Sequence, residues 1–408
     1  MPFRLHDQHV RRPHNMAISK KVHDFISQSS WIRRMFEEGI RLKKEFGAEN
    51  VFDFSLGNPN VEPPDTFKKT LIRLAAEDIP GIHGYMSNAG FQETREAVAA
   101  SILRDHHVAL NADHIMMTCG AAGALNVMFK VLLDPGDEVV VPVPCFMEYR
   151  FYIDNANGIP VFAKTKPDYS LDMDTLREAI TEKTKVVLIN LPNNPTGKVY
   201  DEASIEKLAV LLEEKSKEYG NDIYLATDEP YRDIVYDGVT VPSILKAYKN
   251  SLIANSYSKS LSLPGERIGY LAVNPAISGL AEIMGGFVMY NRVLGFVNAP
   301  ALMQRVIVHL QDVKVNVAEY KKKRDLLCDG LISAGYELEK PDGAFYLFLR
   351  TPIEDEIVFL KALQKRRILV VPGSGFGAPG YIRIAYCVDD AAIVNSMEGF
   401  GETLREYR

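Results

Sequence analysis

Residues 185–257 contain three short apolar runs, which read KVVLIN (185–190), DIYLATD (222–228) and SLIANSY (251–257). Three runs of the same kind flank them: IMMT (115–118), EVVVPV (138–143) and IGYLAVN (268–274). Helical periodicity falls between or beside these runs, at 91–105, 121–133, 146–156, 172–182 and 201–219. Strands that are apolar on both faces and alternate with helices are typical of a sheet covered on both sides. The pattern predicts an α/β fold with a large, doubly wound, mostly parallel sheet.

The segments outside this region have a different pattern. Residues 31–46 show helical spacing, VFDFSL (51–56) is typical of a strand, and an amphipathic helix containing Phe67, Leu71, Leu74 and Ala75 follows. Beyond residue 300 a long helical region extends to about residue 334. Mixed elements follow it: strands YLFLR (346–350), ILVVPG (368–373) and YIRIAY (381–386), and helices at 355–366 and from about 389. This part predicts a smaller α+β unit, and the lack of a Ser/Gly-rich linker predicts a packed boundary.

Composition narrows the class of protein. The chain has 408 residues, 25% charged and 47% hydrophobic, with a formal net charge of −6. These values argue against a disordered chain and predict a soluble globular protein. The negative charge offers no overall attraction to nucleic acid or to an anionic membrane surface, so small-molecule chemistry is favoured.

Cysteine and histidine spacing disfavours a metal site or a disulfide framework. Cys119, Cys145, Cys328 and Cys387 are isolated, and the nine His lack ligand spacing. We expect reduced thiols and a cytoplasmic protein. No apolar run approaches the roughly 20 residues of a membrane-spanning helix, and residues 1–15 lack the apolar segment of a secretory signal. We expect those residues to form an arm or a loose tail.

Two apparent motifs are rejected. GSGFG (373–377) lacks the GxGxxG spacing of a dinucleotide loop and precedes a strand rather than a helix. A GxSxG elbow, which would indicate a serine hydrolase, does not occur.

Small, polar and ionisable residues follow the predicted strands. They lie in TCGAAGAL (118–125), PVPCF (142–146), NLPNNPTG (190–197), DEPY (228–231) and NSYSKS (255–260). Because ligands bind at the carboxyl ends of strands in an open parallel sheet, these residues should meet at one edge. They provide a phosphate cradle, a lysine, a carboxylate, a phenol and an aromatic ring. That set suits a phosphorylated aromatic cofactor carrying an aldehyde.

Lys259 is the candidate nucleophile. It ends an apolar strand between Ser258 and Ser260, where partial desolvation would lower its pKa. A lysine with a lowered pKa supplies the neutral amine that forms a Schiff base with an aldehyde.

Residues 256–269, SYSKSLSLPGERIG, resemble the lysine attachment site of class I pyridoxal-phosphate (PLP) aminotransferases. The resemblance extends from SLGNP (55–59) to YIRIAY (381–386), with several motifs in the order of the fold-type-I, class I/II family, the aspartate aminotransferase superfamily. It implies a large PLP-binding domain at 58–298 and a small domain built from 1–57, with an N-terminal arm, and 299–408. It also implies a homodimer whose active sites are shared across the interface.

The resemblance assigns most cofactor contacts. Asp228 matches the carboxylate that pairs with the pyridine nitrogen, although an Asp there could also be a helix N-cap. Tyr231 and Asn194 match the residues that bond the phenolic oxygen, although NNPTG is also a common turn sequence. The phosphate would be held by Gly120, Ala121, Ala122, Ser256 and Arg267, with Ser258 a weaker candidate and Tyr85 reaching across from a second subunit. Phe146 matches the aromatic residue that stacks on the ring.

Substrate contacts are implied in the same way. Arg383 matches the arginine that binds the α-carboxylate of the substrate, a planar contact that lysine makes poorly. Gly57 and Asn194 would contact the same end of the substrate. Arg292 lies near the position of an arginine that reads a second carboxylate from the neighbouring subunit, or it is an ordinary interface residue.

The predicted activity is therefore transamination between an amino acid, aspartate or another common one, and a 2-oxo acid such as 2-oxoglutarate. In that reaction Lys259, Asp228 and Tyr231 would be catalytic, with no metal. A carbon–sulfur β-lyase of the same fold is the alternative. A PLP-sensing regulator would need a DNA-binding domain, for which the roughly 50 residues before SLGNP leave little room.

Overall fold

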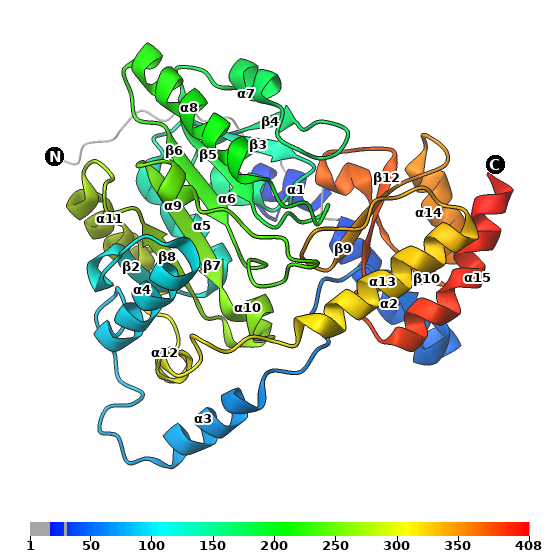
Figure 1. Cartoon of the computed structure of the whole chain (residues 1–408), viewed down its shortest axis with the longest axis horizontal. Coiled ribbons are helices and arrows are strands. Elements are labelled where there is room, and N and C mark those ends of the chain that lie inside the picture. The colour runs from blue at the N-terminus through cyan, green and yellow to red at the C-terminus, as the bar shows by residue number, and fades with distance from the viewer. Residues whose placement is uncertain (1–16, 28–30, 408) are drawn as a thin grey trace.

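The large unit of the computed structural model is a seven-stranded sheet (Figure 1). The structure describes residues 17–27 and 31–407, so the arm expected at 1–15 lies outside the described residues. In spatial order the strands are β2 (Ile115–Thr118), β8 (Gly269–Val273), β7 (Ser251–Ser256), β6 (Tyr224–Asp228), β5 (Thr184–Asn190), β3 (Glu138–Val143) and β4 (Ile159–Lys164). The five strands from β7 to β4 run parallel, and β8 is antiparallel to both of its neighbours. The predicted doubly wound, mostly parallel sheet is confirmed.

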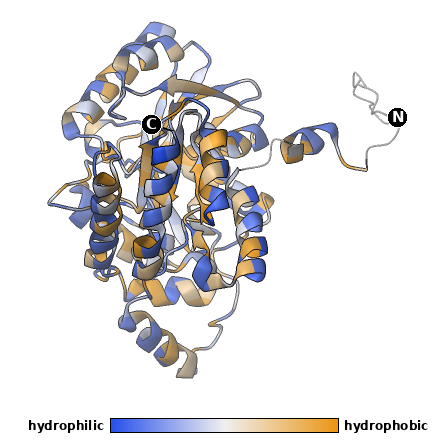
Figure 2. Cartoon of the chain, turned by 90° about the vertical axis from the view of Figure 1, so that its right-hand side faces the viewer, coloured by the Kyte–Doolittle hydropathy of each residue, from blue (hydrophilic) through white to orange (hydrophobic). Residues whose placement is uncertain are grey.

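Helices cover both faces of this sheet, which explains why its inner strands carry apolar residues on both faces. Along β3, Val139 and Val141 pack into the core on one face and Val140 into the core on the other. The first face carries α5 (Gly120–Leu132), α6 (Tyr149–Asn155) and α11 (Leu280–Val293). The second carries α3 (Asp65–Ala76), α4 (Gln92–His106), α7 (Met173–Ala179), α8 (Glu202–Tyr219), α9 (Ile244–Ala247) and α12 (Ala301–Val308). Figure 2 shows the polar sides of the outer helices turned toward solvent.

The smaller unit combines both ends of the described chain. Its antiparallel sheet has the order β11 (Val371–Pro372), β12 (Tyr381–Ala385) and β9 (Tyr346–Arg350). A separate pair joins β1 (Phe52–Asp53) to β10 (Ile368–Leu369) in parallel, so an N-terminal strand lies beside a C-terminal one. Four helices complete the unit: α2 (Trp31–Phe46), α13 (Val317–Ala334), α14 (Glu356–Lys365) and α15 (Asp390–Glu406). The division of the chain at residues 58 and 298 stays a prediction.

Three predictions of local structure were wrong in detail. The strand expected at 51–56 is only β1, because its sole strand partner, β10, is itself two residues long. The helical region expected up to 334 is interrupted between α12 and α13. ILVVPG forms two short strands, β10 and β11, in different sheets.

The sequence interpretation also missed β4 and α11. β4 is an edge strand that contains Pro160 and pairs only with β3, and a single buried side chain gives it a weak apolar signal.

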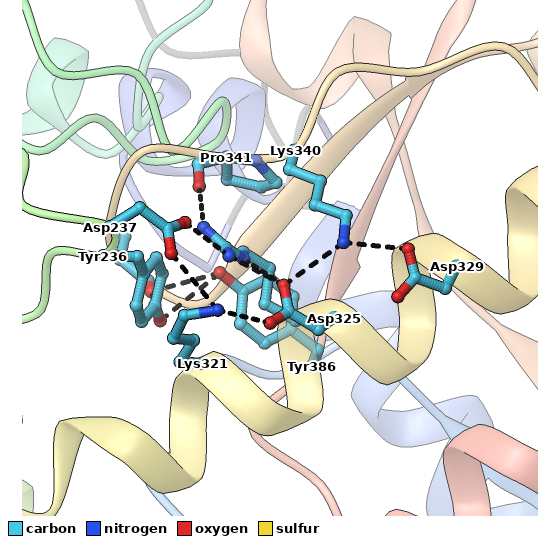
Figure 3. Close-up of polar contacts among 10 residues, drawn as sticks. Tyr236, Asp237, Lys321, Asp325, Asp329, Lys340, Pro341 and Tyr386 are labelled. Atoms are coloured by element: carbon cyan, nitrogen blue, oxygen red, sulfur yellow. Dashed lines mark hydrogen bonds and ion pairs between the residues drawn. The ribbon is translucent and has the colours of Figure 1, made fainter.

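An ion-pair cluster joins the two units (Figure 3). Arg324 of α13 bonds Asp237 at 2.6 Å, Asp325 at 2.7 Å and the carbonyl oxygen of Pro341 at 3.1 Å. Asp325 also pairs with Lys321 and Lys340. Although partial burial acts the other way, the hydrogen bonds from Lys321 and Arg324 lower the pKa of Asp325 to about 2.

Two tyrosine hydroxyls next to the cluster complete this joint. Tyr236 and Tyr386 both donate to the carbonyl oxygen of Ala344 (Figure 3). The backbone N–H of Ala344 donates to the carbonyl of Ile234 at 2.8 Å. The start of β9 is thereby held against the loop that follows β6.

Candidate active site

A cavity of about 910 Å³ lies at the carboxyl ends of β5, β6 and β7. Asn190, Asp228 and Ser256, the last residues of these three strands, line it. Gly57, Tyr346 and Arg383 line it from the smaller unit. The cavity therefore lies where ligands bind in open α/β sheets, between the two units.

Most of the residues predicted from the sequence meet in this cavity. Those lining it are Gly57, Ala121, Ala122, Phe146, Asn194, Asp228, Tyr231, Ser256, Ser258, Lys259, Arg267 and Arg383. Gly120 lies directly behind the lining, next to Arg267. Tyr85 and Arg292 do not line the cavity, and the side chain of Tyr85 is 93% exposed.

Lys259 lies in the short helix α10 (Tyr257–Ser260), which directly follows β7. Its Nζ donates to the carbonyl oxygen of Gly57 at 2.8 Å and lies 5.6 Å from the ring centroid of Phe345. Burial lowers the pKa of Lys259 to about 8, and the positive charges of Arg383 and Arg267 act in the same direction. A substantial fraction of this amine is therefore neutral near pH 8 and able to act as a nucleophile.

Asp228 ends β6 and is buried against α6. Its Oδ2 accepts a hydrogen bond from the hydroxyl of Tyr149 at 2.8 Å, whereas its Oδ1 has no partner among the described residues. Burial raises the pKa of Asp228 to about 7, which the bond from Tyr149 partly opposes. A buried carboxylate oxygen without a partner is costly, so it is suited to a cationic or protonated ligand atom.

The N-terminus of α5 forms an anion cradle with Arg267. Gly120 begins α5 with φ +72°, a left-handed conformation that favours glycine, and a Cβ there would lie 2.7 Å from Nη2 of Arg267 and displace it. Arg267 donates to the carbonyl oxygens of Pro264 and Cys119 at 2.9 and 3.3 Å. The guanidinium is thus held beside the free N–H groups of a helix N-terminus, an arrangement that binds phosphate.

Tyr231 and Tyr346 form a buried pair of phenols. Their hydroxyl oxygens are 2.8 Å apart, and their rings meet edge to face with centroids 5.6 Å apart. Tyr346 also explains the glycine at position 57, because a Cβ there would lie 1.9 Å from its hydroxyl oxygen. The pair joins the large unit to the smaller one at the cavity wall.

Arg383 lies in β12 and is only 1% exposed. It donates to the carbonyl oxygen of Ser55 at 2.6 Å and to Oδ1 of Asn194 at 3.1 Å, and its Nε has no hydrogen-bond partner in the part of the chain that the structure describes. Within the described chain no carboxylate lies within 4.0 Å of its guanidinium, and burial lowers its pKa. A buried guanidinium without a counter-ion is suited to a ligand carboxylate.

These groups together define the ligand that the cavity fits. It should carry an anionic group for the α5 cradle, a carbonyl for Lys259 and a protonatable ring nitrogen for the free Oδ1 of Asp228. Phe146 lines the same space and can cover one face of a planar ring. The described residues include no group of three side chains able to hold a metal ion.

Sequence reasoning missed Tyr149, Tyr346 and Asn190. Nδ2 of Asn190 donates to the carbonyl of Asp228 at 2.8 Å, and its Oδ1 accepts from the N–H of Asn194 at 2.6 Å. For Tyr149 the available signal was its place three residues after Phe146 at a strand end. For Tyr346 it was an aromatic residue beginning an apolar strand three residues after Gly343.

Comparisons with known proteins agree with this geometry. The family "Aminotransferase class I and II" matches residues 49–399. An aspartate/prephenate aminotransferase of Thermus thermophilus is 32% identical, covering 85% of this chain and 89% of its own. An aromatic-amino-acid aminotransferase of Thermococcus litoralis is 30% identical, covering 96% and 100%. A solved amino transferase from Eubacterium rectale superposes with a TM-score of 0.93 at 41% identity, covering 97% of this chain and 100% of its own.

Proposed function

The chain belongs to the class I and II aminotransferases, and from that premise we propose that it uses PLP to move an amino group from an α-amino acid to a 2-oxo acid. The observation that carries the proposal is a set of three groups lining one cavity. Lys259 has a pKa lowered to about 8, and among the described residues Oδ1 of Asp228 has no hydrogen-bond partner and Arg383 has no carboxylate partner. The relatives named above are aminotransferases, so we do not propose the alternative activity of a carbon–sulfur β-lyase.

We assign the cofactor contacts as follows. The N–H groups of Gly120, Ala121 and Ala122 would hold the phosphate together with Ser256 and Arg267. Phe146 would cover the ring, and Asp228 would keep its nitrogen protonated. Tyr231 and Asn194 would bond the phenolic oxygen. When bound, PLP supplies a protonated ring that accepts the electron pair left as the α-proton departs.

The remaining chemistry belongs to the chain. Arg383 binds the α-carboxylate through a bidentate contact and so fixes the orientation of the α-carbon. Neutral Lys259 takes the proton from that carbon at Nζ and returns it on the other side of the reacting system.

A half-reaction screen tests this function directly. The purified holoprotein is mixed with single amino acids while its visible absorbance is recorded and the product is identified. Formation of the matching 2-oxo acid, with one equivalent of amino group retained on the protein, is the expected result. A product that has lost its side chain would instead indicate a lyase.

We also propose a cytoplasmic homodimer. Free thiols at all four cysteines fit a reducing compartment. Among the described helices, none is long and apolar enough to cross a membrane. The exposure of Tyr85 fits a side chain that completes the phosphate site of a second copy.

Subunit complementation tests the shared site. Tyr85→Ala and Lys259→Ala should each lower activity, because each removes one contribution to the same composite site. Mixing the two variants under exchange conditions should restore part of the activity, since each hybrid dimer carries one intact site. Sedimentation that finds a fully active monomer would remove the basis of this assignment.

A second test concerns dicarboxylate substrates. Arg292 is exposed on α11, outside the cavity of its own chain, so it could contact a substrate only from a second copy. If it does, Arg292→Ala should lower the kcat/KM ratio of aspartate over alanine by tens-fold, because truncating one partner of a desolvated charge pair costs about 2–5 kcal/mol. Alanine, which lacks the second carboxylate, is the internal control. An unchanged ratio would leave Arg292 as an interface residue.

A further inference from the structure

One side of the cavity has no role in the contacts assigned above. It consists of six apolar side chains that we call the N-terminal wall: Val22, Phe25, Ile26, Phe36, Leu56 and Phe151. Five of them precede Gly57 in the chain, and Phe151 belongs to α6. They line the same cavity as Lys259 and Arg383, so a substrate held by Arg383 would share the cavity with this apolar surface.

Specific contacts hold the wall in place. Helix α1 (Lys20–Ser27) carries three of its members and projects from the edge of the molecule near the N-terminus (Figure 2). It contacts α6 through Phe25 and Lys21. The rings of Phe25 and Phe151 meet edge to face with centroids 4.8 Å apart, and Lys21 forms an ion pair with Asp154. The guanidinium of Arg150 lies 4.4 Å from the ring centroid of Phe151. The apolar face of α1 is thereby directed toward the cavity.

The wall retains exposed apolar surface that a ligand could cover. Val22 is 45% exposed and Ile26 is 60% exposed, yet both line the cavity. Covering such surface with an apolar ligand group is favourable, whereas a charged group would lose hydration without gaining a partner.

The charged residues around the cavity also disfavour a second carboxylate on the substrate. Among the described lining residues the basic ones are Lys259, Arg267 and Arg383, and each already has a role. The remaining acidic residue besides Asp228 is Glu148, whose pKa is raised by burial. A second carboxylate on the substrate would find no cation from this chain and would approach Glu148.

We infer that the N-terminal wall selects amino donors with apolar or aromatic side chains. The inference rests on the proposed transaminase function and specifies its donor class. Dicarboxylates would enter the same cavity only with Arg292 of a second copy, so the two substrate classes would depend on different residues.

The test measures single-turnover half-reactions of the holoenzyme with phenylalanine, leucine, alanine and lysine. In the unmodified protein, phenylalanine and leucine should exceed alanine in kcat/KM by about tenfold or more, the range expected when a hydrophobic pocket gains several methylene groups. Phe25→Ala and Ile26→Ala should lower the phenylalanine-to-alanine ratio by about tenfold. Phe25→Leu, which keeps an apolar side chain, should retain most of it.

The matched control is Ile72→Ala. Ile72 is likewise 60% exposed but belongs to α3, outside the cavity, so the ratio should not change. The inference is wrong if Phe25→Ala leaves the phenylalanine-to-alanine ratio unchanged, or if the unmodified enzyme prefers lysine. In either case, normal turnover of alanine would still support the transaminase function. If alanine and every other donor fail to react, the proposed function itself is wrong.

Discussion

Replacing Lys259 with alanine is expected to abolish turnover while leaving the fold and a bound cofactor in place. The side chain is the only lysine among the described residues that line the cavity, and its pKa is lowered to about 8. It is proposed both to attach the cofactor and to move the α-proton. Positioned acid–base catalysis alone contributes about 10²–10⁴ in rate, so the loss should reach at least about 10⁴-fold.

The measurement combines turnover with cofactor content. The variant should retain phosphate-bearing cofactor through the α5 cradle but lose the visible band that depends on attachment to the lysine. Lys249→Ala, which removes an exposed lysine outside the cavity, is the control and should retain full activity. Retention of the unmodified rate by Lys259→Ala would refute the mechanism.

Asp228→Ala should produce the second large loss, of about 10³-fold or more. One well-placed electrostatic partner is typically worth about 10²–10³ in rate, and Asp228 is proposed to control the protonation of the ring that stores the electron pair. Its Oδ1 has no hydrogen-bond partner in residues 17–27 and 31–407, and burial raises its pKa to about 7, so a ring cation would supply the missing counter-charge.

A graded series separates this role from packing. Asp228→Asn keeps the shape but not the charge and should lose nearly as much activity as Asp228→Ala. Tyr149→Phe removes the bond to Oδ2 but keeps the carboxylate, and it should cost less than about tenfold. Circular dichroism should show that all three variants fold. A loss below tenfold in Asp228→Ala would contradict the assignment.

The sequence allowed the fold to be predicted where burial is two-sided. The runs KVVLIN and DIYLATD contain stretches of successive apolar residues, VVLI and IYLA, because helices cover both faces of their strands. β4 was missed because it lies at an edge, where one-sided burial weakens the signal. Because β1 and β10 pair with each other, the length of each strand depends on the other. A strand partner more than 300 residues away cannot be recognised from the local sequence, so the length of β1 could not be predicted.

In the candidate site, too, some residues could be identified from the local sequence and others could not. Lys259, Asp228 and Arg267 occur in compact motifs at strand ends, so their neighbours in sequence indicate their roles. Tyr149 contacts Asp228, 79 positions away in sequence, and Tyr346 contacts Tyr231, 115 positions away. A local sequence pattern cannot indicate such long-range pairs. The N-terminal wall was missed for a similar reason, since it forms only where α1 meets α6.

The ion-pair cluster around Arg324 and Asp325 makes the joint between the two units sensitive to ionic strength. Asp237 and Lys321 in this cluster are about half exposed, whereas Asp228 and Arg383 in the cavity are buried. At roughly 1 M salt the Debye length shrinks to about 3 Å, so exposed pairs are screened far more than buried ones. Added salt should therefore loosen the support of β9, and with it the position of Tyr346, before it affects the charges that bind cofactor and substrate.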